Sequence, residues 1–309
     1  MFLNSLQSVA IIFLLTVLGY FCASRGWMNE EVKTFINNFL LNIGIPVMCV
    51  SELTSKLDRA GILAALPFIL TSSLAIGAAM GLAWLLDRVF LHMPRERLGI
   101  FLTMCSVSNA LFIGLVMCVE IFGEECTPHV MMFYLTNTTF NQIVCQMIVR
   151  RTGTVQKTNK LTLLDFLKMP TVLGIFIGIF LVFLDVRLPG VLAQTAQYVA
   201  RTVTPLALLL TGYIIYRTRL KNIRIHRDHL IVLLFRFVLC PALGMLMCYL
   251  FGVTGLARNV MVVELAMPVL SMAVVYASAY GADETFAAEG AALSTLACFF
   301  ITPLLVLVL

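Results

Sequence analysis

Charged residues are scarce in this sequence. Asp, Glu, Lys and Arg together make up 12% of the 309 residues, whereas hydrophobic residues make up 61%. A typical soluble domain carries about 25% charged residues. The apolar residues also come in long runs, so the composition predicts an integral membrane protein.

Long polar segments are also missing. The longest connections, near residues 150–165 and 217–228, are too short to fold as separate domains. The apolar runs have the length of about 20 residues that a membrane-spanning helix needs, and they lack the alternation of an outer-membrane strand. We therefore predict an all-α bundle. Its ten predicted spans are residues 5–24, 35–53, 61–86, 98–122, 129–149, 166–184, 197–216, 229–251, 258–280 and 288–308.

Sequence signatures of enzymes are absent. The chain has no HExxH, GxSxG or DxxxD motif and no glycine-rich phosphate loop. Its nine cysteines include no CxxC pair, so we interpret them as small apolar packing residues and not as disulfides or metal ligands. We predict a protein that is not an enzyme and that carries no cofactor or metal.

The distribution of basic residues predicts the orientation in the membrane. Residues 1–10 contain no Lys or Arg, so the first span reads as a retained helix and not as a signal peptide. With the N-terminus outside, the cytoplasmic connections hold 15 of the 21 Lys and Arg residues, and the external ones hold five. The positive-inside rule then predicts a multi-pass protein of the plasma membrane, or bacterial inner membrane, with both termini outside. This charge faces anionic lipid, and nothing indicates nucleic-acid binding.

A weak internal repeat relates the two halves of the chain. A shift of 158 or 159 residues places Gly19 on Gly178 and Pro46 on Pro205, and it aligns "IFGEE" with "AYGADE". We therefore predict two five-helix units, residues 1–155 and 156–309. Because five is odd, the second unit enters the membrane from the opposite side, and inverted repeats are typical of secondary transporters.

The fourth and ninth spans both carry helix-weakening residues at their midpoints. The fourth contains "CSVSNALFIGLVM" and the ninth contains "VVELAMPVLSMAV", and the shift places Asn109 on Met267, beside Pro268. We predict two broken helices that meet at the bilayer centre, with second halves that begin near Leu111 and Pro268. The N-termini of these half-helices favour an anionic ligand. Either span alone would instead read as an ordinary kinked helix.

Ionisable residues within the predicted spans are few, so each is informative. Glu264 is one turn before Pro268, and a carboxylate at that depth costs about 2.5–3.5 kcal/mol unless it is paired, hydrated or protonated. We predict that it is a coupling or gating group, and the alternative is an interfacial Glu that faces water. Arg236 either pairs with an organic carboxylate or extends to the cytoplasmic surface. In the fifth span, Asn137 and Asn141 share a helix face and either line a cavity or bond neighbouring helices.

Three stretches resemble the auxin efflux carrier family. They are "LTVLGYFCASRGWMNEEVKTFINNFLLNIGIPVM", "SNALFIGLVMCVEIFGEE" and "AMPVLSMAVVYASAYGADE". The resemblance covers nearly the whole chain and is closest to the bacterial members. Leu111 and Val116 stand where the family often has Gly and Pro, so the fourth span is expected to be less sharply broken than the ninth.

The resemblance implies a fold and a function. The fold is a ten-helix inverted repeat of the bile-acid/sodium symporter type, in which helices 4 and 9 cross at the substrate site. The implied activity is efflux or exchange of small organic anions, such as malonate, malate or auxin-like carboxylates, by an elevator mechanism. Protons or sodium are possible coupling ions, and the scaffold often forms a homodimer. A channel or a membrane receptor is the alternative.

The candidate site residues come from the family motifs and from the polar and ionisable residues within the spans. Asn42, Pro46, Asn109, Gly114 and Pro268 match the motifs of the family, and Asn42 either faces the site or bonds a neighbouring helix. The predicted substrate-binding residues are Asn42, Ser108, Asn109, Ala110, Asn137, Asn141, Arg236, Met267 and Pro268. The predicted coupling residue is Glu264, and the predicted hinge residues are Pro46, Gly114 and Pro205.

Overall fold

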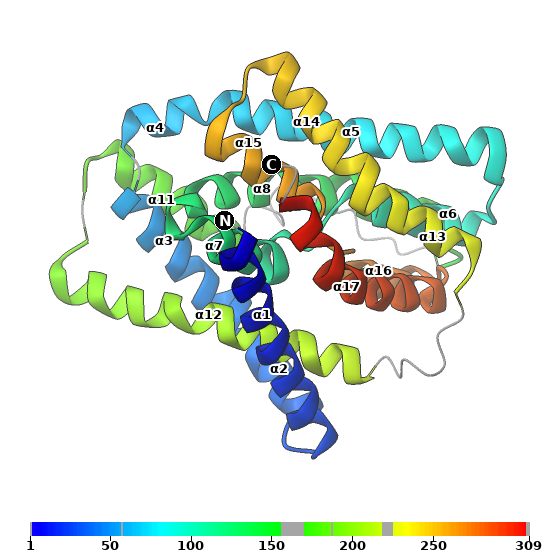
Figure 1. Ribbon diagram of the computed structural model, residues 1–309, viewed down its shortest axis with the longest axis horizontal. Helices are drawn as coiled ribbons and strands as arrows, with labels where there is room; N and C mark the ends of the chain where they lie inside the picture. The colour runs from blue at the N-terminus through cyan, green and yellow to red at the C-terminus, as the bar shows by residue number, and fades with distance from the viewer. Residues whose placement is uncertain (1, 57, 156–169, 187, 218–224, 307–309) are drawn as a thin grey trace.

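The computed structural model describes residues 2–56, 58–155, 170–186, 188–217 and 225–306 (Figure 1). Helices make up most of the described residues, and none of these residues forms a named β-strand, which confirms the all-α prediction. The α-helices are α1 Phe2–Ser24, α2 Glu30–Phe39, α3 Ile45–Lys56, α4 Arg59–Ala64, α5 Leu66–Leu86, α6 Arg95–Ser106, α7 Leu115–Phe122, α8 Thr127–Thr139, α9 Gln146–Thr152, α11 Pro170–Phe183, α12 Gly190–Arg217, α13 Arg227–Leu234, α14 Cys240–Phe251, α15 Gly255–Leu265, α16 Met272–Tyr280 and α17 Glu284–Val306.

Short turns of other helix types join several of these α-helices end to end. The π-helical turns are η1 Leu40–Gly44, η2 Asp87–Leu91, η3 Ala110–Gly114, η5 Phe140–Cys145 and η7 Phe235–Leu239, and the 3₁₀ turn is η4 Glu124–Cys126. A π-helical turn adds one residue to the helix without ending it. As a result, α2 continues through η1 into α3, and α13 continues through η7 into α14.

Four of the described helical runs are long and apolar enough to cross a membrane. They are Glu30–Ser55, Leu66–Leu91, Gly190–Arg217 and Arg227–Phe251, of 26, 26, 28 and 25 residues. At about 1.5 Å per residue, each exceeds the roughly 30 Å of a hydrocarbon core. Shorter apolar helices cover Phe13–Ser24, Ala110–Phe122 and Val172–Phe183. These features support a multi-pass membrane protein.

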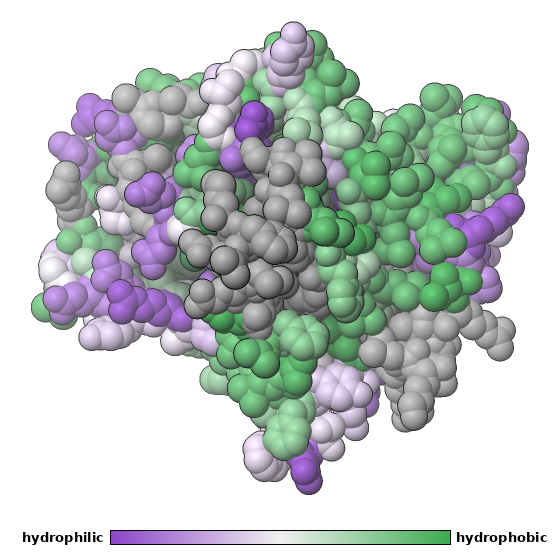
Figure 2. Space-filling model, viewed as in Figure 1, coloured by the Kyte–Doolittle hydropathy of each residue, from purple (hydrophilic) through white to green (hydrophobic). Residues whose placement is uncertain are grey.

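The outer surface is apolar where it would contact lipid. Leu66 and Leu70 of α5 are 56% and 54% exposed, and Leu246 and Leu250 of α14 are 48% and 60% exposed. Figure 2 shows hydrophobic side chains gathered over α13, α14 and the neighbouring part of α5. A continuous apolar surface of this extent is costly in water and is stable against acyl chains.

Glycines allow two pairs of helices to approach closely. A Cβ atom on Gly212 of α12 would overlap the backbone oxygen of Thr16 in α1, and a Cβ atom on Gly19 would overlap the backbone of Leu209. In the second pair, a Cβ atom on Gly174 of α11 would overlap the backbone of Pro46 in α3. Small residues let helix backbones pack directly in a membrane, where no hydrophobic effect drives their association.

We expect Gly212→Ala to destabilise the protein. The added methyl group has no space against Thr16, and overpacking of this kind costs about 1–3 kcal/mol. The measurement is the midpoint of thermal unfolding in detergent, with Gly190→Ala as the control, because no atom lies within 4 Å of a Cβ atom built there. Equal midpoints for the two variants would contradict the close contact between α1 and α12.

Several connections meet at one end of the molecule. Arg95 donates a hydrogen bond to the carbonyl oxygen of Arg151 at 2.9 Å, and Arg97 forms ion pairs with Asp228 at 2.9 Å and Asp283 at 2.8 Å. All of these belong to connections that the charge distribution assigns to the cytoplasm. Several predictions fall outside the described residues: the boundary between the repeats, the start of the sixth predicted span, and the basic residues Lys157, Lys160, Lys168, Arg187, Arg219, Lys221 and Arg224.

Candidate functional site

The first helix break separates α6 from η3. Helix α6 ends at Ser106, Val107 is extended, and the helix resumes at Ala110. Asn109 caps the second half, because its side-chain oxygen accepts a hydrogen bond from the Phe112 N–H at 3.4 Å. Asn is a favoured residue at a helix N-cap, so the polar residues at this midpoint account for the restart of the helix close to the predicted position.

The second break separates α15 from α16 and is longer. Helix α15 ends at Leu265, and α16 begins only at Met272. The prediction that the second half begins near Pro268 was therefore wrong by four residues. Pro268 disfavours helical geometry in the residue before it and has no N–H, and the chain after it is held in a bridge to the first break.

The two breaks bind each other through their main chains. Ser108 and Val269 form an isolated antiparallel β-bridge, and the Asn109 N–H donates to the Pro268 carbonyl oxygen at 2.9 Å. The midpoints of the fourth and ninth predicted spans, which the predicted repeat aligns with each other, are thus hydrogen-bonded in the structure. Such non-helical backbone is tolerated at membrane depth only when it is buried in protein and its polar groups are satisfied.

Side chains from two other helices complete this backbone pairing. Asn137 of α8 accepts from the Ser108 N–H at 3.0 Å and donates to the Ser108 carbonyl oxygen at 2.8 Å. Ser294 of α17 accepts from the Val269 N–H at 3.0 Å. Asn137 therefore bonds a neighbouring segment with both amide atoms. Ser294 is not among the predicted site residues, although the predicted repeat places it within two residues of the position related to Asn137.

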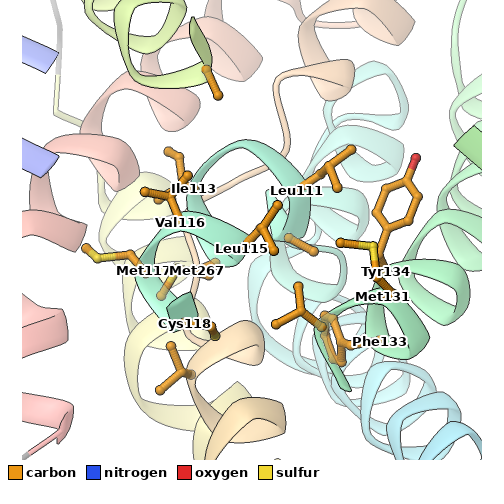
Figure 3. Close-up of a cluster of buried hydrophobic side chains, with 14 of the residues drawn as sticks. Leu111, Ile113, Leu115, Val116, Met117, Cys118, Met131, Phe133, Tyr134 and Met267 are labelled. Carbon is orange, nitrogen blue, oxygen red and sulfur yellow. The ribbon is translucent and has the colours of Figure 1, made fainter. Parts of the chain in front are cut away.

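Residues 107–109 of the first break and 266–269 of the second are buried. The exposed fractions are 1% for Ser108, 4% for Asn109, 1% for Ala110 and 0% for Met267. Figure 3 shows the apolar side of this region, where side chains of η3 and α7 lie near Met267 and the aromatic residues of α8. The structure thus presents a closed conformation at the breaks.

Three buried polar atoms near the breaks have no hydrogen-bond partner among the described residues. They are Ser108 Oγ, Asn141 Oδ1 and Glu264 Oε2. The amide nitrogen of Asn141 donates to the Tyr276 hydroxyl at 3.1 Å, so only its oxygen is open. An unsatisfied buried polar atom costs about 1–3 kcal/mol, which makes these atoms the places where a ligand or a proton would be stabilised.

Glu264 and Arg236 are both fully buried, at 0% exposure. Glu264 accepts a weak hydrogen bond from the Cys118 thiol at 3.6 Å, and its carboxyl group lies against Gly114, where a Cβ atom would overlap it. It is therefore not an interfacial residue that faces water. Arg236 of η7 donates to the carbonyl oxygens of Met267 at 2.9 Å and Leu265 at 2.6 Å, so it does not extend to the membrane surface.

The remaining candidates lie on other elements. Asn42 is exposed on η1, unlike the residues of the breaks. Pro46 follows η1 at the start of α3, and Pro205 lies inside α12, so both occupy positions where a helix is irregular or weakened. Gly114 is the last residue of η3 and is buried against Glu264.

A pocket of about 440 Å³ lies elsewhere, and none of its lining residues belongs to the breaks. It is lined by Ala23, Met28, Asn29, Glu30, Glu31, Tyr213, Tyr216 and Arg217. Buried polar atoms without a hydrogen-bond partner among the described residues lie near the breaks and not in this pocket. We therefore take the breaks as the candidate site.

Comparison with known proteins identifies the family of the chain. Residues 4–306 match the family described as membrane transport protein. An uncharacterized transporter of Methanocaldococcus jannaschii is 25% identical over 278 residues, which cover 89% of each chain. The match to the family extends over almost the whole sequence. The chain therefore belongs to the membrane transport protein family, the auxin efflux carrier family that its motifs resemble.

Proposed function

We propose that this transporter carries small organic anions and binds them at the two helix breaks. The observation that carries the proposal is the pairing of Asn109 with Pro268, beside the unpartnered hydroxyl group of Ser108. Each second half-helix directs its N-terminus toward the breaks, where unsatisfied N–H groups and the positive end of the helix dipole favour a carboxylate. Malonate, malate and auxin-like carboxylates fit this chemistry.

The packing of the helices supports ten spans in two inverted repeats. Helix α1 packs on α12, and α11 packs on α3. If α1 and α11 are the first spans of the two repeats, and α3 and α12 end the second spans, these two contacts are equivalent by symmetry. The contacts of α5 with α6 and of α14 with α15 form a second equivalent pair.

We propose an elevator mechanism on this framework. The glycine-mediated pairs α1–α12 and α3–α11 form the scaffold, and the helices that contain and surround the breaks form the moving domain. Pro46 and Pro205 lie in the scaffold helices and are the proposed hinges. The scaffold would also form the homodimer interface, since Val191 and Tyr198 of α12 are 79% and 72% exposed.

A channel or a receptor is the alternative function. A channel needs a continuous polar lining or rings of charge. In the described part of the chain, the polar residues of the breaks are enclosed and few. This arrangement favours alternating access over a pore.

Counterflow in proteoliposomes tests the proposed function. We expect preloaded malonate, malate, succinate or an indole carboxylate to drive saturable uptake of the same labelled anion, because the site binds a carboxylate without a driving gradient. Empty liposomes are the control. Absence of counterflow for all four anions with correctly folded protein would contradict the assignment to organic anions.

The orientation gives a separate prediction. We expect both termini to be external, because the connections assigned to the cytoplasm hold 15 basic residues against five outside. Fusions of alkaline phosphatase and green fluorescent protein to the C-terminus measure this directly. Strong fluorescence without phosphatase activity would show a cytoplasmic C-terminus and overturn the orientation.

A further inference from the structure

Arg236 is a fully buried cation whose donors bind main-chain oxygens. Its Nε and Nη2 atoms donate to Met267 and Leu265, the residues at which α15 ends and the second break begins. The last carbonyl groups of a helix have no partner within the helix and carry the negative end of its dipole. The guanidinium group therefore neutralises the C-terminal end of α15.

The same side chain also reaches toward the first break. Its Nη1 atom lies 3.9 Å from the Cys240 sulfur, and the Cys240 thiol donates to the Cys105 carbonyl oxygen at 3.1 Å. Cys105 is in the last turn of α6. Arg236 thus contacts the end of one broken helix directly and the end of the other through Cys240.

Carbonyl groups at the C-terminal ends of broken membrane helices are ligands that coordinate sodium in transporters of this general design. In this protein, the Arg236 side chain already supplies a positive charge to carbonyl groups at such a helix end. Glu264, one residue before Leu265, adds a carboxylate to the same region. The charge that an external cation would supply is therefore built into the chain.

We propose that Arg236 is a tethered cation that takes the place of a coupling sodium ion at the crossed helices. Transport is then independent of sodium, and the N-terminal ends of the opposite half-helices remain for the anion. Arg236 is a positioning residue in this arrangement and does not bind the substrate directly. The inference rests on the proposed function, because it concerns the ion requirement of the same site.

The first test compares ions in the wild type and in Arg236→Ala. Wild-type counterflow is expected to change less than about twofold when choline replaces sodium. Arg236→Ala is expected to lose activity by about tenfold or more in choline, because charge-assisted hydrogen bonds are lost. Sodium, or guanidinium well below its denaturing concentrations, is expected to restore much of that activity. Tetramethylammonium, which neither donates a hydrogen bond nor lets carbonyl oxygens approach its charge as closely as sodium does, is the control cation.

The second test needs no substrate. Sodium is expected to raise the midpoint of thermal unfolding of Arg236→Ala and to leave that of Arg236→Lys unchanged, because Lys retains the charge. Arg258→Ala is the matched control, since Arg258 lies on α15 but bonds its neighbour Asn259. If Arg236 only held the helices together, the Arg236→Ala protein would be less stable, and neither sodium nor guanidinium would raise its midpoint of unfolding.

The outcomes separate the two proposals. Sodium-dependent stabilisation of Arg236→Ala in a protein that transports none of the anions would retain the cation site and reject the substrate class. A wild type that requires sodium overturns the inference. So does an Arg236→Ala protein that neither cation rescues, including one that fails to fold when purified with guanidinium.

Discussion

Asn109→Ala is expected to reduce transport to less than about a tenth of the wild-type rate while the protein still folds. The side-chain oxygen of Asn109 caps η3, where the helix restarts after the first break, and its amide group is one of the polar side chains at the breaks. The main-chain hydrogen bond to Pro268 remains in the variant, so the breaks stay paired. Counterflow and size-exclusion profiles measure the two effects separately.

Asn29→Ala is a matched control for this substitution. Asn29 caps α2 in the same way, accepting from the Val32 N–H at 2.9 Å, but lies outside the breaks. If loss of a cap were sufficient, both variants would lose activity. Pro268→Ala is expected to be as inactive as Asn109→Ala, because the restored N–H and the loss of the clash between the proline ring and the preceding turn allow α15 to continue as a helix. Wild-type turnover in both site variants would refute the crossover site.

The second prediction is that Glu264→Gln keeps counterflow but loses accumulation driven by a pH gradient. Glu264 is fully buried, and one of its oxygens has no partner among the described residues. A substrate anion bound nearby disfavours a second negative charge, so anion binding and proton uptake are linked in the sense that proton symport requires. Gln has nearly the same shape as Glu, but its amide group does not take up or release a proton.

Uptake against an imposed pH gradient is the measurement, and Glu31→Gln on the exposed surface of α2 is the control. The control is expected to accumulate substrate as the wild type does. If Glu264→Gln also accumulates substrate in response to the gradient, Glu264 is structural. An uncoupled or sodium-linked carrier would then be the better description, and the sodium-linked case would also contradict the role proposed for Arg236.

Local chemistry made the positions of the breaks predictable. Asn109 caps a helix and Pro268 ends one, and both effects act within a few residues of the chain. The start of α16 at Met272 was not predictable in this way, because the residues after Pro268 are held by the bridge from Ser108 to Val269. Composition predicted the all-α membrane class because that class depends on the average environment of the side chains and not on specific contacts between them.

The partners of the buried polar residues depend on the tertiary structure. Arg236 was assigned to an organic carboxylate or to the membrane surface, but it donates to main-chain oxygens 29 and 31 positions away in sequence and contacts the Cys240 sulfur. No pattern in the sequence identifies a backbone carbonyl group as the partner of a side chain. In the sequence, only the predicted repeat indicated that Ser294 lies near the breaks. The π-helical turns were also missed, because they depend on packing more than on residue type.

The bridge between the breaks joins residues that the ribosome makes far apart in time. Ser108 and Val269 are 161 positions apart. At a synthesis rate of about 5–20 residues per second, Val269 is therefore made roughly 8–30 s after Ser108. During that interval the backbone of the first break would be costly to leave unpaired in lipid. Asn137 is synthesised only 29 residues after Ser108 and bonds both its N–H and its carbonyl group. The first half of the chain thus supplies temporary protection for its own part of the site until the second half is inserted.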